Sequence, residues 1–268
     1  MHDPILIDDP EDTRIAAYGA IRERDLVGRR GEFIAEGAVV LAMLVKAPRH
    51  RPLSLLIDRK RVDSLADLTA RLAQDVPLYV ASQAVIDAVA GFALHRGILA
   101  HGKAAPPLEP GTMLAGVAED GVVVALSGIA NHDNMGGIFR NAAAFGAAGV
   151  LLDSDCCDPL YRKAIRVSVG TSLTLPFARL PRGADLPGLI ASAGFRMLAL
   201  SPSGRQELHR LKCDGRTALL LGAEGPGLAP ALLDRVETVK IAMAAGVDSL
   251  NVATTSGIVL HHLTAGRR

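Results

Sequence analysis

The feature that most constrains the fold is a series of short apolar runs between residues 122 and 243. These runs show little of the alternation between apolar and polar residues that marks a half-exposed strand, so we expect both faces of each strand to be buried. Helical stretches lie between them, for example residues 136–146 and 186–194. This pattern predicts an α/β domain with a parallel sheet covered by helices. The runs are VVVAL (122–126), GVLLD (149–153), SLTLPF (172–177), RMLALS (196–201), TALLLG (217–222) and TVKIAM (238–243).

The first part of the chain differs in pattern and is set apart by a break in composition. Residues 102–111, GKAAPPLEPG, contain three prolines and a final glycine, all hostile to helix, and so predict a linker. We therefore expect two domains, residues 1–105 and 106–268. Short helices and strands alternate in the first, which predicts a small α/β/α module. The expected elements are a helix over 33–47, a strand over 53–58, a helix over 64–74 opened by Ser64, a strand over 77–82, and a helix capped by Ser82 and ended near Gly91.

Charge is nearly balanced over the whole chain, with a formal net charge of +1. No global basic field therefore indicates a nucleic-acid partner, and any such surface must be local. Between residues 20 and 61, ten basic residues stand against five acidic ones. One interpretation is a solvated surface; the other is a face that contacts RNA phosphates. The candidate RNA-binding residues are Arg49, Arg51, Arg59, Lys60 and Arg61.

Several classes of protein are disfavoured by composition. No apolar run approaches the roughly 20 residues that cross a bilayer, and the acidic N-terminus, MHDPILIDDPED, lacks the pattern of a signal peptide. The three cysteines, two of them adjacent at 156 and 157, give neither a disulfide framework nor a zinc spacing. The adjacent residues His261 and His262 cannot share a helical face as metal ligands. We expect a cytoplasmic protein with no metal and no membrane association.

Three loops that follow buried strands carry the candidate chemistry, because open parallel sheets bind ligands at the carboxyl ends of their strands. The loops are NHDNMGGIFRNAAAFG (131–146), LLLGAEGPGLAP (219–230) and KIAMAAGVDSLNVATTSGIVLHHL (240–263). The second lacks the Gly-Lys-Ser/Thr ending of a phosphate-binding loop and the third glycine of a dinucleotide fingerprint. A dinucleotide-dependent enzyme is therefore disfavoured. Each loop alone is weak support for a ligand site, since a glycine-rich turn is often only a turn.

In this order, the three loops resemble the signature motifs of the SpoU (TrmH-like) family of RNA ribose 2′-O-methyltransferases, within the SPOUT superfamily. The resemblance covers the C-terminal domain and extends to the N-terminal module, which is similar to the ribosomal-protein-like substrate domain that often precedes it. Ala242 departs from the pattern, because the family usually has proline there. The matching positions are Asn131, Asn134, Gly136, Gly137, Ile138 and Arg140; Leu221, Gly222, Glu224, Gly225, Gly227 and Leu228; and Ile241, Met243, Val247, Ser249, Leu250, Asn251 and Val252.

The resemblance implies a SPOUT domain whose C-terminal segment threads a trefoil knot, a rare exception to unknotted chains. It also implies S-adenosylmethionine as cofactor. Glycines would let backbone groups grip this cofactor, while apolar neighbours hold the adenine. The alternative for the apolar residues is that they only fill the core. The implied cofactor-binding residues are Leu221, Gly222, Ile241, Met243 and Leu250.

The resemblance further implies a catalytic set of Asn134, Arg140, Glu224, Ser249 and Asn251. Arg140 is the family's proposed catalytic residue. Because a guanidinium is effectively always protonated, we expect it to stabilise a phosphate and the developing alkoxide rather than to remove a proton. A surface salt bridge is the alternative.

The other four catalytic candidates have simpler alternatives as well. Asn134 would orient Arg140 or the ribose, or else cap the following helix. Glu224 would anchor Arg140 or backbone amides of the third loop and accept a proton, or else be a solvated carboxylate. Ser249 and Asn251 fall at a helix start, where capping is the ordinary role, and the family position adds hydrogen bonding in the active site.

The resemblance therefore predicts an S-adenosylmethionine-dependent RNA 2′-O-ribose methyltransferase that acts as a homodimer. The substrate-type N-terminal module favours ribosomal RNA over transfer RNA, by analogy only. Two alternatives stay open: a transfer RNA 2′-O-methyltransferase, and a catalytically silent RNA-binding protein with the same fold.

Overall fold

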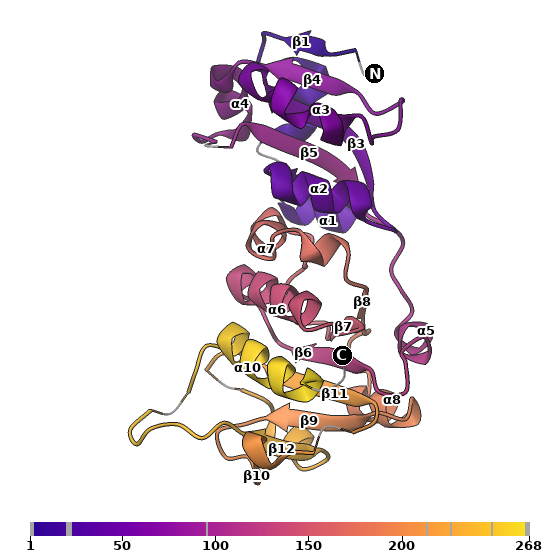
Figure 1. The fold of residues 1–268 in the computed structure, drawn as a ribbon, viewed down its shortest axis with the longest axis vertical. Coiled ribbons are helices and arrows are strands. Elements are labelled where there is room, and N and C mark those ends of the chain that lie inside the picture. Colours follow the sequence, from indigo (N-terminus) through magenta and orange to yellow (C-terminus); the bar gives the residue numbers. More distant parts are fainter. Residues whose placement is uncertain are drawn as a thin grey trace. The chain divides into compact units, whose positions relative to one another are not determined.

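The computed structural model describes residues 3–19, 23–94, 96–212, 214–225, 227–247 and 249–265. By their contacts, the residues divide into two units (Figure 1). Unit 1 comprises Met1–Pro106 and Leu160–Thr174, and unit 2 comprises Pro107–Pro159 and Leu175–Arg268. Residues 160–174 fall within the predicted range of the second domain, 106–268, but they pack with unit 1. No sequence pattern marks such a segment. None of the described helices is long and apolar enough to cross a membrane.

Unit 1 is built on a mixed five-stranded sheet. The strand order is β1-β4-β3-β5-β2, parallel from β1 to β3 and antiparallel from β3 to β2. Its strands are β1 (Ile5–Ile7), β2 (Glu32–Glu36), β3 (Arg51–Asp58), β4 (Leu78–Ala81) and β5 (Ile98–Lys103). Its helices are α1 (Glu23–Arg30), α2 (Ala38–Lys46), α3 (Ala66–Thr69), α4 (Gln83–Ala90) and α7 (Arg162–Val167), with 3-10 turns η1 (Thr13–Tyr18), η2 (Arg59–Arg61), η3 (Asp63–Leu65) and η4 (Thr171–Leu173).

The predicted elements of unit 1 are confirmed in part. The strands at 53–58 and 77–82 are present as β3 and β4, and α4 begins at the Ser82 cap and ends at Gly91 in the left-handed conformation. The helix predicted over 33–47 is wrong in its first part, which forms β2, because Gly37 at φ 94° separates a strand from α2. The helix predicted over 64–74 is reduced to the four residues of α3.

The β5 strand was missed altogether, because its polar residues interrupt the apolar pattern. It lies in the middle of the sheet between β3 and β2. Gly102 of β5 has Phe33 of β2 directly against it, since a Cβ atom at this position would lie 2.4 Å from the ring. Glycine is therefore required for this pairing. On the sheet, Tyr18 and Ser54 form a buried hydrogen bond of 2.7 Å between their hydroxyl groups.

Unit 2 contains the predicted parallel sheet. Its seven strands lie in the order β10-β12-β9-β11-β6-β7-β8, and every pair is parallel. The strands are β6 (Val122–Ser127), β7 (Gly149–Leu152), β8 (Phe177–Arg179), β9 (Arg196–Leu200), β10 (Gln206–Glu207), β11 (Thr217–Gly222) and β12 (Glu237–Lys240). The helices are α5 (Pro110–Ala115), α6 (His132–Ala144), α8 (Leu186–Ser192), α9 (Pro230–Leu233) and α10 (Val252–Thr264), with one 3-10 turn, η5 (Leu208–Arg210).

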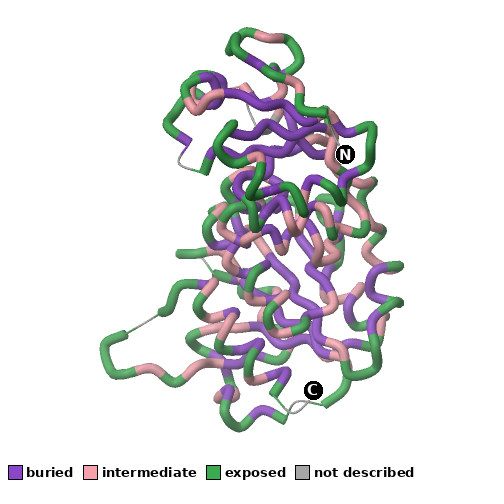
Figure 2. Tube along the Cα trace, turned by 45° about the horizontal axis from the view of Figure 1, so that its top comes forward, coloured by how far each residue is buried: buried purple, intermediate pink, exposed green. Residues whose placement is uncertain are grey.

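Helices cover both faces of this sheet, as the unbroken apolar runs predicted. Residues of α5 and α8 pack with Val123, Ala125 and Leu220 in one continuous core, while α6 and α10 lie side by side over the other face (Figure 1). Buried residues follow the strands, and exposed residues are concentrated in the loops (Figure 2). Two predicted strands were too long. The run 172–177 joins the sheet only at Phe177, and β12 ends at Lys240, which leaves Ile241 and Met243 in a loop.

The pairing of α6 with α10 is close and polar. A Cβ atom at Gly137 of α6 would lie 2.7 Å from the Cβ atom of Ala253, so only glycine allows this approach. The Asn141 side chain donates hydrogen bonds to the Ala253 carbonyl (2.7 Å) and the Ser256 hydroxyl (3.0 Å). The start of α10 is thereby fixed against α6.

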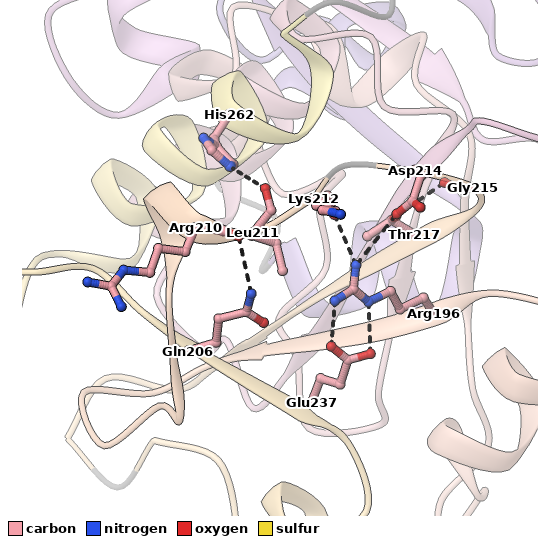
Figure 3. Close-up of polar contacts among 10 residues, drawn as sticks. All are labelled: Arg196, Gln206, Arg210, Leu211, Lys212, Asp214, Gly215, Thr217, Glu237 and His262. Carbon is pink, nitrogen blue, oxygen red and sulfur yellow. Dashed lines mark hydrogen bonds and ion pairs between the residues drawn. The ribbon is translucent and has the colours of Figure 1, made fainter.

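The opposite end of α10 is tied to the loop that precedes β11. His262 is hydrogen-bonded to the Leu211 carbonyl at 3.3 Å (Figure 3). Arg196, the first residue of β9, fastens the same loop: it donates to the Lys212 carbonyl at 3.0 Å and forms a bidentate pair with Glu237 of β12 at 2.8 and 2.6 Å. Hydrogen bonds therefore hold α10 near both of its ends.

Candidate active site

The first predicted loop places its asparagines at the start of α6. The Asn131 side chain accepts hydrogen bonds from the backbone amides of Asp133 (2.7 Å) and Asn134 (3.3 Å), so Asn131 is the N-cap. The capping role considered for Asn134 is therefore excluded. Asn134 lies within the helix and is buried, with 6% of its surface exposed. A buried side-chain amide requires hydrogen-bond partners.

The three predicted motifs meet at one side chain, Asn251. Its amide nitrogen donates to the side-chain oxygen of Asn134 at 2.9 Å and to the carboxylate of Glu224 at 3.0 Å. Its oxygen accepts from the backbone amides of Ala253 (2.9 Å) and Thr254 (3.2 Å), which makes it the N-cap of α10. Asn251 thus combines the ordinary capping role with a contact among all three loops.

A pocket of about 720 Å³ lies beside this contact, a size that suits a small molecule or cofactor. All five predicted cofactor-binding residues line it, together with three of the five predicted catalytic residues. Glu224 is the only acidic group among the described lining residues. The lining is Leu200, Ser201, Pro202, Leu221, Gly222, Ala223, Glu224, Gly225, Gly227, Leu228, Leu233, Ile241, Met243, Ser249, Leu250, Asn251, Val252 and Thr255.

The glycines in the second loop are required by the pocket's geometry. A Cβ atom at Gly222 would lie 2.8 Å from the carbonyl carbon of Gly227 and from the backbone nitrogen of Leu228. Gly225 and Gly227 have φ of +85° and +66°, in the left-handed region. The Gly227 amide donates a hydrogen bond to the Ala223 carbonyl at 3.1 Å, so the loop folds back towards the end of β11. Backbone polar groups therefore line a wall from which side chains are excluded.

Arg140 is not part of the pocket lining. It lies exposed on α6, and among the described residues no hydrogen bond or ion pair engages its guanidinium. The surface salt bridge considered as an alternative is thus not seen in the described part of the chain. A cation on the helix that bears Asn134 is in a position to bind an anion from solution.

The five predicted RNA-binding residues belong to unit 1 and form two groups. Arg49 and Arg51 stand at the start of β3, whereas Arg59, Lys60 and Arg61 form η2 directly after it. Because a strand rises about 3.3 Å per residue, the two groups are roughly 25 Å apart. Arg49 donates to the Pro106 carbonyl, and Arg59 is paired with Asp8. They do not form one continuous patch.

One part of the pocket, at the carboxyl end of β9, was not predicted. Leu200, Ser201 and Pro202 line the site, although none belongs to the recognised motifs. The strand-end rule could have found them, because β9 is a buried strand that is followed by a polar turn. Asn141 was missed too, and only its contacts with α10 reveal its role.

Cys156 and Cys157, the two cysteines among the described residues, do not line the pocket. Burial raises the pKa of Cys156 to about 12 and that of Cys157 to about 11, so both are neutral thiols at pH 7. Among the described residues, no group of three or more His, Cys, Asp or Glu side chains is arranged to hold a metal ion.

Comparison with known proteins identifies the family. Residues 121–261, which span all three loops, match the model of the SpoU rRNA Methylase family. The chain belongs to this family. It is 38% identical to an uncharacterized tRNA/rRNA methyltransferase of Mycobacterium bovis over 96% of this chain and 90% of that protein. It is also 28% identical to the 23S rRNA (guanosine-2′-O-)-methyltransferase RlmB of Vibrio vulnificus, over 85% and 94% of the two chains.

Solved structures agree with this assignment at the level of the fold. An rRNA methyltransferase from Sinorhizobium meliloti superimposes with a TM-score of 0.80 at 21% identity, covering 97% of both chains. The SpoU methyltransferase AviRb from Streptomyces viridochromogenes, in complex with AdoMet, gives a TM-score of 0.80 at 23% identity over 96% and 98% of the chains. The predicted family, the α/β fold with a parallel sheet, and the enzyme class of RNA methyltransferase are confirmed.

Proposed function

We propose that this SpoU family member transfers a methyl group from S-adenosylmethionine to the 2′-hydroxyl of a ribose in ribosomal RNA. One observation carries the proposal. The five residues expected to hold the cofactor line one pocket, and the Asn134–Asn251–Glu224 hydrogen-bonded cluster stands at its side. Ribosomal RNA is favoured because the family model and the relative from Vibrio vulnificus are both named for it.

The pocket fits the proposed cofactor in its chemistry. Leu221, Ile241 and Leu250 offer apolar surface to an adenine ring, and the glycine wall at Gly222 offers backbone donors and acceptors to polar atoms. When bound, the cofactor supplies an electrophilic methyl group on a positively charged sulfur. The protein's part is to place a ribose oxygen against that group and to handle its proton.

Arg140 is the proposed electrostatic catalyst. A guanidinium remains protonated in proteins, so it serves as a fixed positive charge for the RNA phosphate and for the alkoxide that develops on the 2′-oxygen. Asn134, on the same helix, orients the ribose. Asn251 holds Glu224 at 3.0 Å, which leaves the second carboxylate oxygen of Glu224 to receive the released proton. Ser249, exposed at the pocket, supplies a further hydrogen bond to the substrate.

The proposal extends to the domains and the assembly. Residues 1–105 act as the RNA substrate-binding domain, with Arg49, Arg51 and the Arg59–Arg61 turn as phosphate contacts, and residues 106–268 act as the SPOUT domain. The segment after β12 threads the family's trefoil knot before it reaches α10. The enzyme is a cytoplasmic homodimer that pairs through this domain. Val247 and Ile258 support the pairing, because they expose 48% and 40% of their surface.

Arg140→Ala tests the proposal. We expect it to reduce methyl transfer to RNA by at least about a hundredfold, the usual cost of removing one electrostatic contact to the transition state. Its cofactor Kd, measured by calorimetry, should stay within about twofold of wild type, because Arg140 does not line the pocket. Arg140→Lys serves as the control that keeps charge without the planar fork. Unchanged transfer, or a cofactor Kd that rises with the loss of transfer, would contradict the assigned role.

A further inference from the structure

Unit 1 exposes an aromatic ring that nothing in the proposed reaction uses. Phe92 follows α4 and has 48% of its surface exposed. The chain has six phenylalanines and no tryptophan, so an exposed ring is uncommon in it. Phe33, Phe139 and Phe195, by comparison, are buried. An exposed aromatic ring in an RNA-modifying protein calls for a ligand with a planar face.

A guanidinium already lies on one face of this ring. The Arg162 guanidinium carbon, from α7, is 4.8 Å from the centroid of Phe92. This is a cation–π contact, and it holds the ring in a defined orientation. Because the guanidinium lies over one face of the ring and Phe92 is still 48% exposed, we infer that the other face is open to solvent.

A buried carboxylate fixes the arginine. Glu36, at the end of β2, is 6% exposed and accepts hydrogen bonds from the Arg162 guanidinium at 3.3 and 3.2 Å. Arg166, one turn later on α7, lies 3.8 Å from the same carboxylate, with 44% of its side chain exposed. A buried acid that holds two arginines costs desolvation, and here it sets their positions in advance.

The charge of this surface is positive. Arg96 lies against Gly37, since a Cβ atom at Gly37 would be 3.0 Å from the Arg96 Cδ atom. Arg96 and Arg166 are exposed at the surface. With Arg162, they bring three cations to the surface around Glu36. Three separate elements therefore bring an open ring and excess positive charge to one place.

We propose that Phe92, Arg162, Arg166 and Arg96 form a stacking site for one unpaired base of the RNA substrate. The base lies on the open face of Phe92, and its flanking phosphates are bound by Arg96 and Arg166. Stacking requires an unstacked base, so the site selects single-stranded RNA over duplex. Glu36 acts as a positioning residue. The inference rests on the proposed function, which makes RNA the partner.

Phe92→Trp provides a direct test, because it would introduce the only tryptophan of the full chain. We expect a short adenine homopolymer to quench its fluorescence and a blunt duplex RNA of equal length to leave it unchanged. Leu6→Trp is the matched control: Leu6 is 59% exposed on β1, at the sheet edge opposite β2, and should show no quenching. Phe92→Ala should weaken binding of the homopolymer on the order of tenfold and leave duplex binding unchanged.

Other outcomes would overturn the site. For Phe92→Trp, these are no quenching of fluorescence, or equal quenching by duplex RNA. For Phe92→Ala, they are an equal loss of affinity for both RNA forms, or a changed sedimentation mass. A changed mass would assign the ring to a contact between copies of the chain. Methyl transfer by the wild type separates the two proposals. Transfer without selective loss in Phe92→Ala refutes only the stacking site. Quenching without any transfer refutes only the proposed enzyme.

Discussion

Replacement of Asn251 by alanine tests whether one side chain holds the active site together. The change removes the N-cap of α10 and the amide that donates to Asn134 and Glu224. Loss of an N-cap costs about 1 kcal/mol of unfolding free energy. The oxygen of Asn134 is left without its donor in a 6% exposed residue, which costs about 1–3 kcal/mol. Glu224 is exposed and is rehydrated at little cost. The total loss is therefore about 2–4 kcal/mol.

Asn251→Ser divides this total into its parts. Serine caps a helix about as well as asparagine but is too short to reach Asn134 and Glu224, so it should be about 1 kcal/mol more stable than the alanine variant. Urea unfolding followed by circular dichroism measures both values. Because two units can unfold separately, the relevant transition is the one that S-adenosylmethionine shifts to higher denaturant.

Two results would show that Asn251 does not stabilise the active site through these hydrogen bonds. One is an Asn251→Ala variant within about 0.5 kcal/mol of wild type, a change typical of an ordinary surface substitution. The other is exact additivity of Asn134→Ala and Asn251→Ala, because two hydrogen-bonded partners should show a coupling of about 1 kcal/mol or more. Either result would mean that the contact in the structure carries no energy.

Three more predictions concern the pocket, the pH dependence of stability and the ion pair between β9 and β12. Gly222→Ala should raise the cofactor Kd at least about tenfold in calorimetry, because its methyl group would collide with the backbone of residues 227 and 228. Gly116→Ala is the control: its methyl group would make only ordinary contacts, so the Kd should not change. Burial, with a smaller contribution from Arg49, lowers the pKa of His50 to about 4. The free energy of unfolding of unit 1 should therefore be highest above about pH 6.5, where His50 is neutral in both the folded and the unfolded state. It should fall by about 2 kcal/mol as the pH drops towards 4. His50→Gln should flatten that fall in thermal scans; an unchanged pH profile would contradict a neutral His50 that accepts the Ala105 amide. Glu237→Gln should cost less than about 1 kcal/mol in urea unfolding, because its pair with Arg196 is half exposed; a loss above about 2 kcal/mol would show that the pair does more than join two strand ends.

Many strands of unit 2 were predictable, because burial in the core alone determines which residues they contain. Strands buried on both faces of a parallel sheet can only be apolar, so runs such as residues 122–126 and 217–222 point to β6 and β11 directly. Unit 1 was harder to predict. Phe33, Val40 and Leu44 fall in helical phase, yet Gly37 divides them between a strand and a helix. The β5 strand, with polar and glycine residues inside the sheet, lacked any apolar periodicity.

The residues of the candidate site were predictable from the sequence, but the contacts between them were not. Motif positions predicted five cofactor-binding residues, and all five line one pocket. No sequence pattern shows that Asn251 donates to both Asn134 and Glu224, because these residues are 117 and 27 positions away in the chain. Nor could the sequence reveal that Arg162 pairs with Glu36. That contact forms because residues 160–174, which lie between β7 and β8 in the chain, pack with unit 1.

The chemical position of the transferred methyl group shows whether the protein is an RNA 2′-O-methyltransferase. The full-length protein is incubated with S-adenosylmethionine labelled in its methyl group and with ribosomal RNA from cells that lack the protein, and the product is mapped by alkaline hydrolysis. A 2′-O-methyl ribose cannot be cleaved at its 3′ phosphate by alkali. We therefore expect label in the RNA and a gap in the ladder at a defined nucleotide, both absent with Arg140→Ala. Label on a base with an unbroken ladder, or no label in the RNA at all, would contradict it.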